Sequence, residues 1–144
     1  MPPLPDAIRR FLLRHHVVGL ATCDERGEPW AASCFYAFDP ADIDLIVLTD
    51  PSTRHGRAML ARPQVAGTIA GQPGAIAKIQ GIQFSAHATL LAGDAAEAAY
   101  ALYCRRHPVA RLKRGAAWRL ALQQVKFTDN ALVPGNKTYW QRGE

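Results

Sequence analysis

Residues 48–55 concentrate side chains that could bind an anion. Their sequence, LTDPSTRH, places two hydroxyls, an arginine and a histidine directly after a proline turn. Ser52 or Thr53 is suited to cap a helix, which would leave free backbone N–H groups and the positive end of the helix dipole beside these side chains. An ordinary capped helix start with exposed basic residues would explain the same pattern. The segment is therefore a candidate phosphate site, with Arg54 as its main cation.

Other patterns that would indicate catalysis or metal binding are missing from the sequence. The five histidines show no metal-ligand spacing among themselves or with the acidic residues, so no metal site is expected. There is no GxSxG nucleophile elbow, no Rossmann glycine pattern and no Walker motif. No side chain stands out as a catalytic acid or base, so any redox chemistry would have to come from a bound cofactor.

The net charge of +5 favours an anionic partner. Seven basic residues and no acidic one lie between Glu97 and Asp129, and a basic surface that binds nucleic acid is therefore one alternative. Aromatic residues for base stacking are sparse there, with Trp118 the main candidate, so this alternative is the less favoured one. The basic residues are Arg105, Arg106, Arg111, Lys113, Arg114, Arg119 and Lys126.

Hydrophobic periodicity predicts a single domain over residues 1–144, mainly β with flanking helices. We expect helices at 6–16, from Ser52 or Thr53 to about 62, and at about 95–106, with Asp6 capping the first and an Asp94/Glu97 capping box starting the last. We expect strands at 17–23, 30–38, 43–49, 64–70, 75–91 (bent or bulged at Gly81), 118–128 and 137–140.

Long strands interrupted by helices indicate a six-stranded antiparallel split β-barrel. A barrel of this size has a thin core, so a homodimer is expected, with one flank of each subunit covered by the other. No apolar run is long enough to span a membrane and no signal peptide is visible, so we expect a cytoplasmic protein without a membrane partner.

The order of the motifs resembles the pyridoxamine-phosphate-oxidase-like FMN-binding split barrels. Residues 18–22 (VGLAT) and 27–29 (GEP) resemble the family's first hairpin, and Thr49 followed by residues 53–55 (TRH) resembles its strand-ending threonine and Ser-Arg-Lys helix start. Residues 62–67 (RPQVAG) resemble the family's Asn-Pro and following strand, and segments at 71–73, 79–84, 105–111 and 126–130 extend the resemblance to the YhbP-like branch.

This resemblance implies that FMN is the cofactor. It implies that Arg54 binds the phosphate beside Ser52, with Thr53 at the usual serine position and His55 where a lysine is usual. It further implies ring contacts from Thr49, from Gln83 and from the strand that contains Ser33, Phe35 and Tyr36. Lys137 and Trp140 could reach the flavin from the partner subunit, although Trp140 could equally seal the dimer interface.

The C-terminal segment departs from the family pattern. True pyridoxamine-phosphate oxidases have an Arg-Leu-His-type motif there, and this chain has residues 136–140, NKTYW. We therefore expect an FMN-binding protein, and a flavin-dependent oxidoreductase acting on a small molecule other than pyridoxamine phosphate. A flavin carrier or sensor without turnover is the alternative, and a tetrapyrrole ligand is also compatible with this barrel.

Overall fold

The computed structural model describes residues 1–131, 133 and 135–143. The chain forms, in order, α1 (Asp6–Arg14), β1 (Val17–Cys23), β2 (Pro29–Phe35), β3 (Ala37–Asp39), β4 (Asp44–Leu48), α2 (Arg54–Ala61), β5 (Gln64–Ala70), β6 (Gln80–Leu90), α3 (Gly93–Arg106), β7 (Ala117–Asp129) and β8 (Asn136–Gln141). Short 3₁₀ turns lie at Ile76–Lys78 and Pro108–Leu112.

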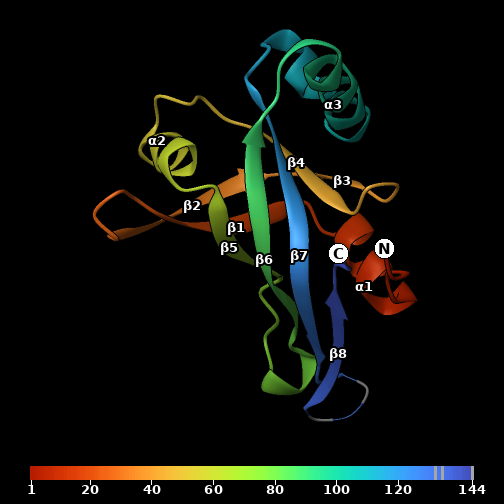
Figure 1. The fold of residues 1–144 in the computed structure, drawn as a ribbon. Helices are drawn as coiled ribbons and strands as arrows, with labels where there is room; N and C mark the ends of the chain where they lie inside the picture. Colours follow the sequence, from red (N-terminus) through yellow and green to blue (C-terminus); the bar gives the residue numbers. More distant parts are fainter. Residues whose placement is uncertain (132, 134, 144) are drawn as a thin grey trace.

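All eight strands belong to one antiparallel sheet in the order β2-β1-β5-β6-β7-β4-β3, with β8 also paired to β7. The sheet curls so that β5–β8 face β1–β4 across the core, which gives the half-barrel in Figure 1. The first part of β7 pairs with β4 and its last part with β8. The fold is thus a mainly β, α+β half-barrel with three α-helices.

Strict alternation of side chains forms the core. In β5, the buried residues Val65, Gly67 and Ile69 alternate with exposed ones, as a half-buried strand requires. The inward side chains pack with Ile8, Phe11 and Leu12 of α1 and Met59 of α2. A second cluster lies outside the barrel, where α3 packs Ala99 and Tyr103 on Ala37, Ile46 and Ala117.

Several expectations about the elements need correction. The sheet has eight strands and not six, partly because the strand expected at 30–38 ends at Phe35 and resumes as β3. The bulge lies between Ser85 and Ala86 and not at Gly81, because β7 carries an extra residue, Gln123, where it changes partner from β4 to β8.

Two predicted helix caps are also wrong. Pro5 is the N-cap of α1, and Asp6 is its first helical residue. Ala92 is the N-cap of α3, where no side chain caps the helix, because Glu97 binds Arg114 through two hydrogen bonds of 3.1 and 2.6 Å. The predicted cap of α2 is confirmed, since Thr53 accepts the N–H of Gly56.

The two termini lie together beside α1 (Figure 1). The Trp140 indole N–H donates to the carbonyl of Pro2 at 3.1 Å, and the Arg142 guanidinium donates to the carbonyls of Asp42, Ile43 and Leu122. These bonds attach the C-terminal segment to the turn before β4. Among the described residues, no helix has the length and apolar character needed to cross a membrane.

Candidate functional site

The loop from β4 into α2 is held tightly in one conformation. The Thr53 hydroxyl accepts the N–H of Gly56 at 3.0 Å and donates to the carbonyl of Asp50 at 2.8 Å. The Asp50 carboxylate accepts the N–H of Ser52 at 2.7 Å. Gly56 is required here, because a Cβ at this position would lie 2.6 Å from the Asp50 carbonyl oxygen. The first N–H groups of α2 have no acceptor within the helix, so they face the loop as possible anion ligands.

Arg54 is oriented by its neighbours on the β1–β2 hairpin. Its guanidinium lies 3.9 Å from the ring centroid of Trp30 and 3.9 Å from the Glu28 carboxylate. The side chain remains 45% exposed, so its other N–H groups can reach a ligand. This is the residue that the sequence predicted as the phosphate ligand, and the structure places it in the first turn of α2.

His55 and Thr49 bind each other beneath this loop. The His55 Nε2 lies 2.7 Å from the Thr49 hydroxyl, and the Trp118 indole N–H donates to the Thr49 carbonyl at 3.0 Å. Burial lowers the pKa of His55, so the imidazole is neutral at pH 7. His55 therefore supports the loop and adds no charge for a phosphate.

A cation that the sequence did not indicate lies on the other side of the loop. The pKa of Asp50 is lowered by hydrogen bonds from Ser52 and, in addition, by the charge of Lys113. The segment after Lys113 runs beside the end of β4, where the N–H of Thr49 donates to the carbonyl of Ala116 at 3.0 Å. Only the pairing of β4 with β7 brings this segment here. Lys113 is thus near enough to the loop for its charge to act on Asp50.

Four of the remaining predicted site residues, Ser33, Phe35, Gln83 and Lys137, lie on the outer face of the sheet. Ser33, Gly19, Thr68, Gln83, Lys126 and Tyr139 form one register row across β2, β1, β5, β6, β7 and β8. Residues opposite each other in a sheet share a face, so Ser33 and Gln83 point the same way. Phe35 lies two residues along β2 and Lys137 two residues along β8, both exposed on this face.

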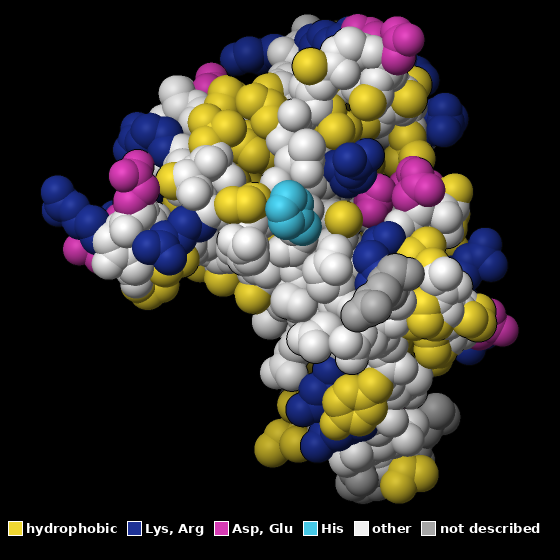
Figure 2. Space-filling model, viewed as in Figure 1, with side chains coloured by type: hydrophobic (Ala, Val, Ile, Leu, Met, Phe, Trp, Pro, Cys, Tyr) yellow, Lys and Arg dark blue, Asp and Glu magenta, His cyan; other side chains and the backbone are white. Residues whose placement is uncertain are grey.

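Over β5 and β6 this outer face has no Lys, Arg, Asp or Glu, whereas Lys126 and Lys137 lie on it toward β8. Figure 2 shows it as a largely white surface over β5 and β6. A cavity of about 530 Å³ opens on it between β6 and β8 and is lined by Gln83, Phe84, Ser85, Gln124, Val125, Lys126, Tyr139, Trp140 and Gln141. The three glutamine amides can both donate and accept hydrogen bonds, which suits a ring with mixed donor and acceptor edges.

The end of β4 and Gln83 lie at opposite ends of β6. Leu48, at the end of β4, pairs with Ala117, and Leu90 pairs with the adjacent Trp118. Seven residues of strand separate Leu90 from Gln83, which is about 23 Å along β6. Thr49 is therefore far from Gln83 within one subunit, and Arg54 is directed to Trp30 of the β1–β2 hairpin.

Tyr36 and Trp140 are placed differently from the other predicted residues. The Tyr36 hydroxyl donates to the carbonyl of Leu12 at 2.8 Å inside the core. Trp140 is 6% exposed and packs in the same core, with its N–H bonded to Pro2. Both side chains are almost fully enclosed by the subunit, although Trp140 also lines the outer-face cavity, so the flavin contacts expected of them stay predictions.

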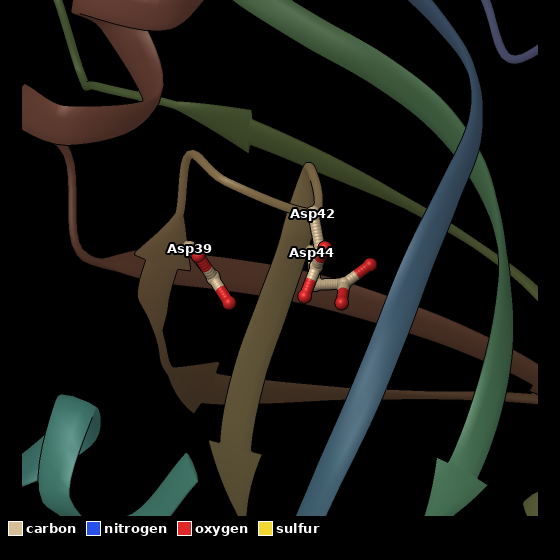
Figure 3. A group of neighbouring side chains, drawn as sticks. All are labelled: Asp39, Asp42 and Asp44. Atoms are coloured by element: carbon tan, nitrogen blue, oxygen red, sulfur yellow. The ribbon is translucent and has the colours of Figure 1, made fainter. Parts of the chain in front are cut away.

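A cluster of three carboxylates at the β3–β4 turn was not predicted (Figure 3). One oxygen each of Asp39, Asp42 and Asp44 lies within 4.8 Å of the others. Asp44 is 3% exposed, and burial raises its pKa to about 6, although Arg119 at 3.9 Å and Arg142 at 3.5 Å oppose the shift. The two guanidinium groups indicate an internal ion-pair network that holds the C-terminal segment.

The basic residues between Glu97 and Asp129 do not form one surface. Arg114 binds Glu97 and stacks on Tyr100, and Arg119 pairs with Asp44. Lys126 lies on the outer face of the sheet. Acidic residues distant in the sequence thus neutralise part of the run, which weakens the nucleic-acid alternative.

Comparisons with known proteins agree with this fold. The family model described as pyridoxamine 5'-phosphate oxidase matches residues 4–129. A UPF0306 protein of Yersinia pseudotuberculosis is 47% identical over 138 residues, which cover 95% of this chain and 92% of the relative.

Two solved structures share the fold at low identity. A heme-binding protein from Mycobacterium smegmatis superposes with a TM-score of 0.77 at 19% identity, covering 96% of this chain and 59% of that one. An FAD-binding protein from Mesorhizobium loti superposes with a TM-score of 0.68 at 17% identity, covering 85% and 92%. Because the family model matches most of the chain, this protein belongs to the pyridoxamine 5'-phosphate oxidase family.

Proposed function

We propose that this protein binds a flavin, with FMN as the smallest complete ligand, at the interface of a homodimer. The start of α2 carries the proposal. It combines unpaired backbone N–H groups, the Ser52 hydroxyl, the oriented guanidinium of Arg54 and the nearby charge of Lys113. Two cations and a helix N-terminus suit the double negative charge of a phosphate monoester.

The second subunit is proposed to supply the ring contacts. The helix α2 packs Met59 into the core and Arg54 on Trp30, whereas Gln83 is exposed on the outer face of the sheet, so a flavin that contacts both is proposed to take them from different chains. The outer face that contains Gln83 suits an interface with a second copy. Its β5 and β6 strands have no Lys, Arg, Asp or Glu, and it exposes Val17, Phe35 and Tyr139, whereas a solvated sheet face usually carries charges.

An amide-lined face favours a flavin over a heme at this interface. The pyrimidine edge of a flavin alternates donors and acceptors, which Gln83 and Gln124 could match. When bound, the flavin would supply hydride or electron transfer, and the chain would bind and orient it. Lys137 and Tyr139 on β8 would face a small substrate there. The C-terminal segment has no counterpart of the arginine and histidine expected in a true pyridoxamine-phosphate oxidase, so we propose a different small substrate.

Titration with FMN and riboflavin, followed by flavin fluorescence and absorption, tests this proposal. Arg54→Ala should weaken FMN binding about 10-fold or more, the effect of losing a charged hydrogen bond, and should leave riboflavin binding unchanged because riboflavin has no phosphate. Arg9→Ala, an exposed arginine on α1, is the matched control.

Two results would contradict the proposal. Equal binding of FMN and riboflavin would move the phosphate away from α2. Tight binding of hemin with no binding of micromolar flavin would replace the flavin with a tetrapyrrole. Light scattering under the same conditions should give the mass of a dimer, and a monomer would remove the interface site.

A further inference from the structure

A polar groove between α2 and the β1–β2 hairpin is not used by the proposed FMN site. Its volume is about 610 Å³, which is within the range of small-molecule sites. The hairpin contributes Asp24, Glu25, Arg26 and Glu28, and α2 contributes Arg54, Arg57, Ala58 and Ala61. The four α2 positions recur at helical spacing, so they form one wall that leads from Arg54 toward the end of the helix. The groove therefore begins at the proposed phosphate ligand.

The cations at this place exceed what one phosphate needs. Arg57 faces the groove one turn after Arg54, and its guanidinium donates to the Ser52 carbonyl at 2.9 Å, which holds it beside the loop. Two guanidinium groups, Arg54 and Arg57, one turn apart on the same helix wall can pair with two linked phosphates, since a diphosphate diester carries two separate negative charges.

The rim of the groove offers a stacking surface. Trp30 is 46% exposed, and Arg54 covers one face of its indole ring at 3.9 Å. An exposed indole stacks on nucleobases independently of sequence, and stacking on an arginine-supported ring is a common way to hold a base. The other two tryptophans, Trp118 and Trp140, are buried, so Trp30 alone can play this role among them.

The acidic residues of the hairpin fit hydroxyl groups better than phosphates. Asp24 is occupied by the N–H groups of Arg26 and Glu28 within the turn. The Glu28 carboxylate lies 3.9 Å from Arg54 and is exposed, as is Glu25. Carboxylates at the far side of an anion site can accept hydrogen bonds from a ribose diol.

We propose that this groove binds an adenosine diphosphate moiety, so that the preferred ligand is FAD and not FMN. The flavin phosphate lies at the start of α2, the second phosphate lies at Arg57, and the adenine stacks at Trp30. This inference rests on the proposed flavin site and extends its ligand from a mononucleotide to a dinucleotide.

Titrations of the protein with FMN, FAD and ADP test the inference. FAD should bind at least 10-fold more tightly than FMN. Ala61→Glu places a negative charge in the groove at an exposed helical position, remote from the start of α2, and should weaken FAD about 10-fold while leaving FMN unchanged. Ala101→Glu, at an exposed position of α3, is the matched control and should change neither affinity.

Tryptophan fluorescence separates the groove from the flavin site. ADP should quench the emission of the exposed Trp30, and Trp30→Leu should abolish the quenching. Equal affinities for FMN and FAD, with no effect of Ala61→Glu, would show that the groove does not bind the adenosine diphosphate moiety. The proposed flavin site would not be contradicted by this result. Failure of both flavins to bind, with ADP quenching intact, would overturn the proposed function and support the groove. Absence of ADP quenching would overturn the groove regardless of flavin binding.

Discussion

The buried Asp44 should make the protein less stable as the pH rises. Its pKa is raised from 3.8 to about 6, mainly by burial, against the attraction of Arg119 and Arg142 and with repulsion from Asp42 and Asp39. Between these two pH values the native state binds a proton that the unfolded chain has released. The resulting stabilisation is fully present below pH 3.8 and is lost as the pH rises through about 6. A shift of about two pKa units sets an upper bound of about 3 kcal/mol.

Asp44→Asn should remove this pH dependence, because the amide stays neutral. Urea unfolding at pH 4.5, 6 and 8 measures it. The free energy of unfolding of the variant, relative to wild type, should rise by about 1–3 kcal/mol between pH 4.5 and pH 8. Taking the difference cancels the opposite trend of the lowered carboxyl pKa values elsewhere, such as that of Glu97. Glu25→Gln, on the exposed β1–β2 turn, is the control because Glu25 has no part in the Asp44 cluster. Parallel pH profiles for wild type and Asp44→Asn would refute the reasoning.

Three further changes test other parts of the structure. Gly56→Ala should displace the Asp50 carbonyl, which would lie 2.6 Å from the new Cβ. We expect the free energy of unfolding to fall by at least about 1 kcal/mol and the affinity for FMN to fall more than that for riboflavin. Gly74→Ala, which has open space around it, should have neither effect. Arg142→Ala should remove hydrogen bonds to three backbone carbonyls and so destabilise the protein by about 2–4 kcal/mol. Amide hydrogen exchange in β8 should become faster, and unchanged exchange would show that Arg142 does not hold the C-terminal segment. Tyr139→Asp changes a position that is 65% exposed on the outer face. Light scattering should then give the mass of a monomer, while the melting temperature of the subunit stays the same. A variant that remains a dimer would place the interface elsewhere.

The strands were predictable where one face is buried and the other exposed. The strands β1 (Val17–Cys23) and β5 (Gln64–Ala70) have the bounds that the sequence predicted, because their alternation is regular and turn residues flank them. The long β7 was also found, although its division between two partners was not. Alternation reports that a face is buried, but it does not say which strand covers the next edge. The prediction of a six-stranded barrel therefore had too few strands.

The candidate site was predictable only where its residues are neighbours in the sequence. Thr53 and Arg54 were identified from a local pattern, since capping and a helix N-terminus are local properties. Lys113 was not singled out for this site, because it reaches the loop only through the pairing of β4 with β7. The ion pair between Asp44 and Arg142 was missed for the same reason, since the two residues are about two thirds of the chain apart in sequence.

The face of the sheet on which a residue lies determines which of the predicted ligands share one surface. Trp140 and Lys137 lie three residues apart on β8, so they point to opposite faces, and only Lys137 reaches the outer one. The same parity places Ser33 and Gln83 on that face, away from the start of α2. A phosphate site at one end of the half-barrel and an amide-lined face at the other cannot serve one small ligand within one chain. Two copies related by a twofold axis can, because each would set its amide-lined face against the partner's α2. The dimer is thus a condition for the flavin site, and loss of one should abolish the other.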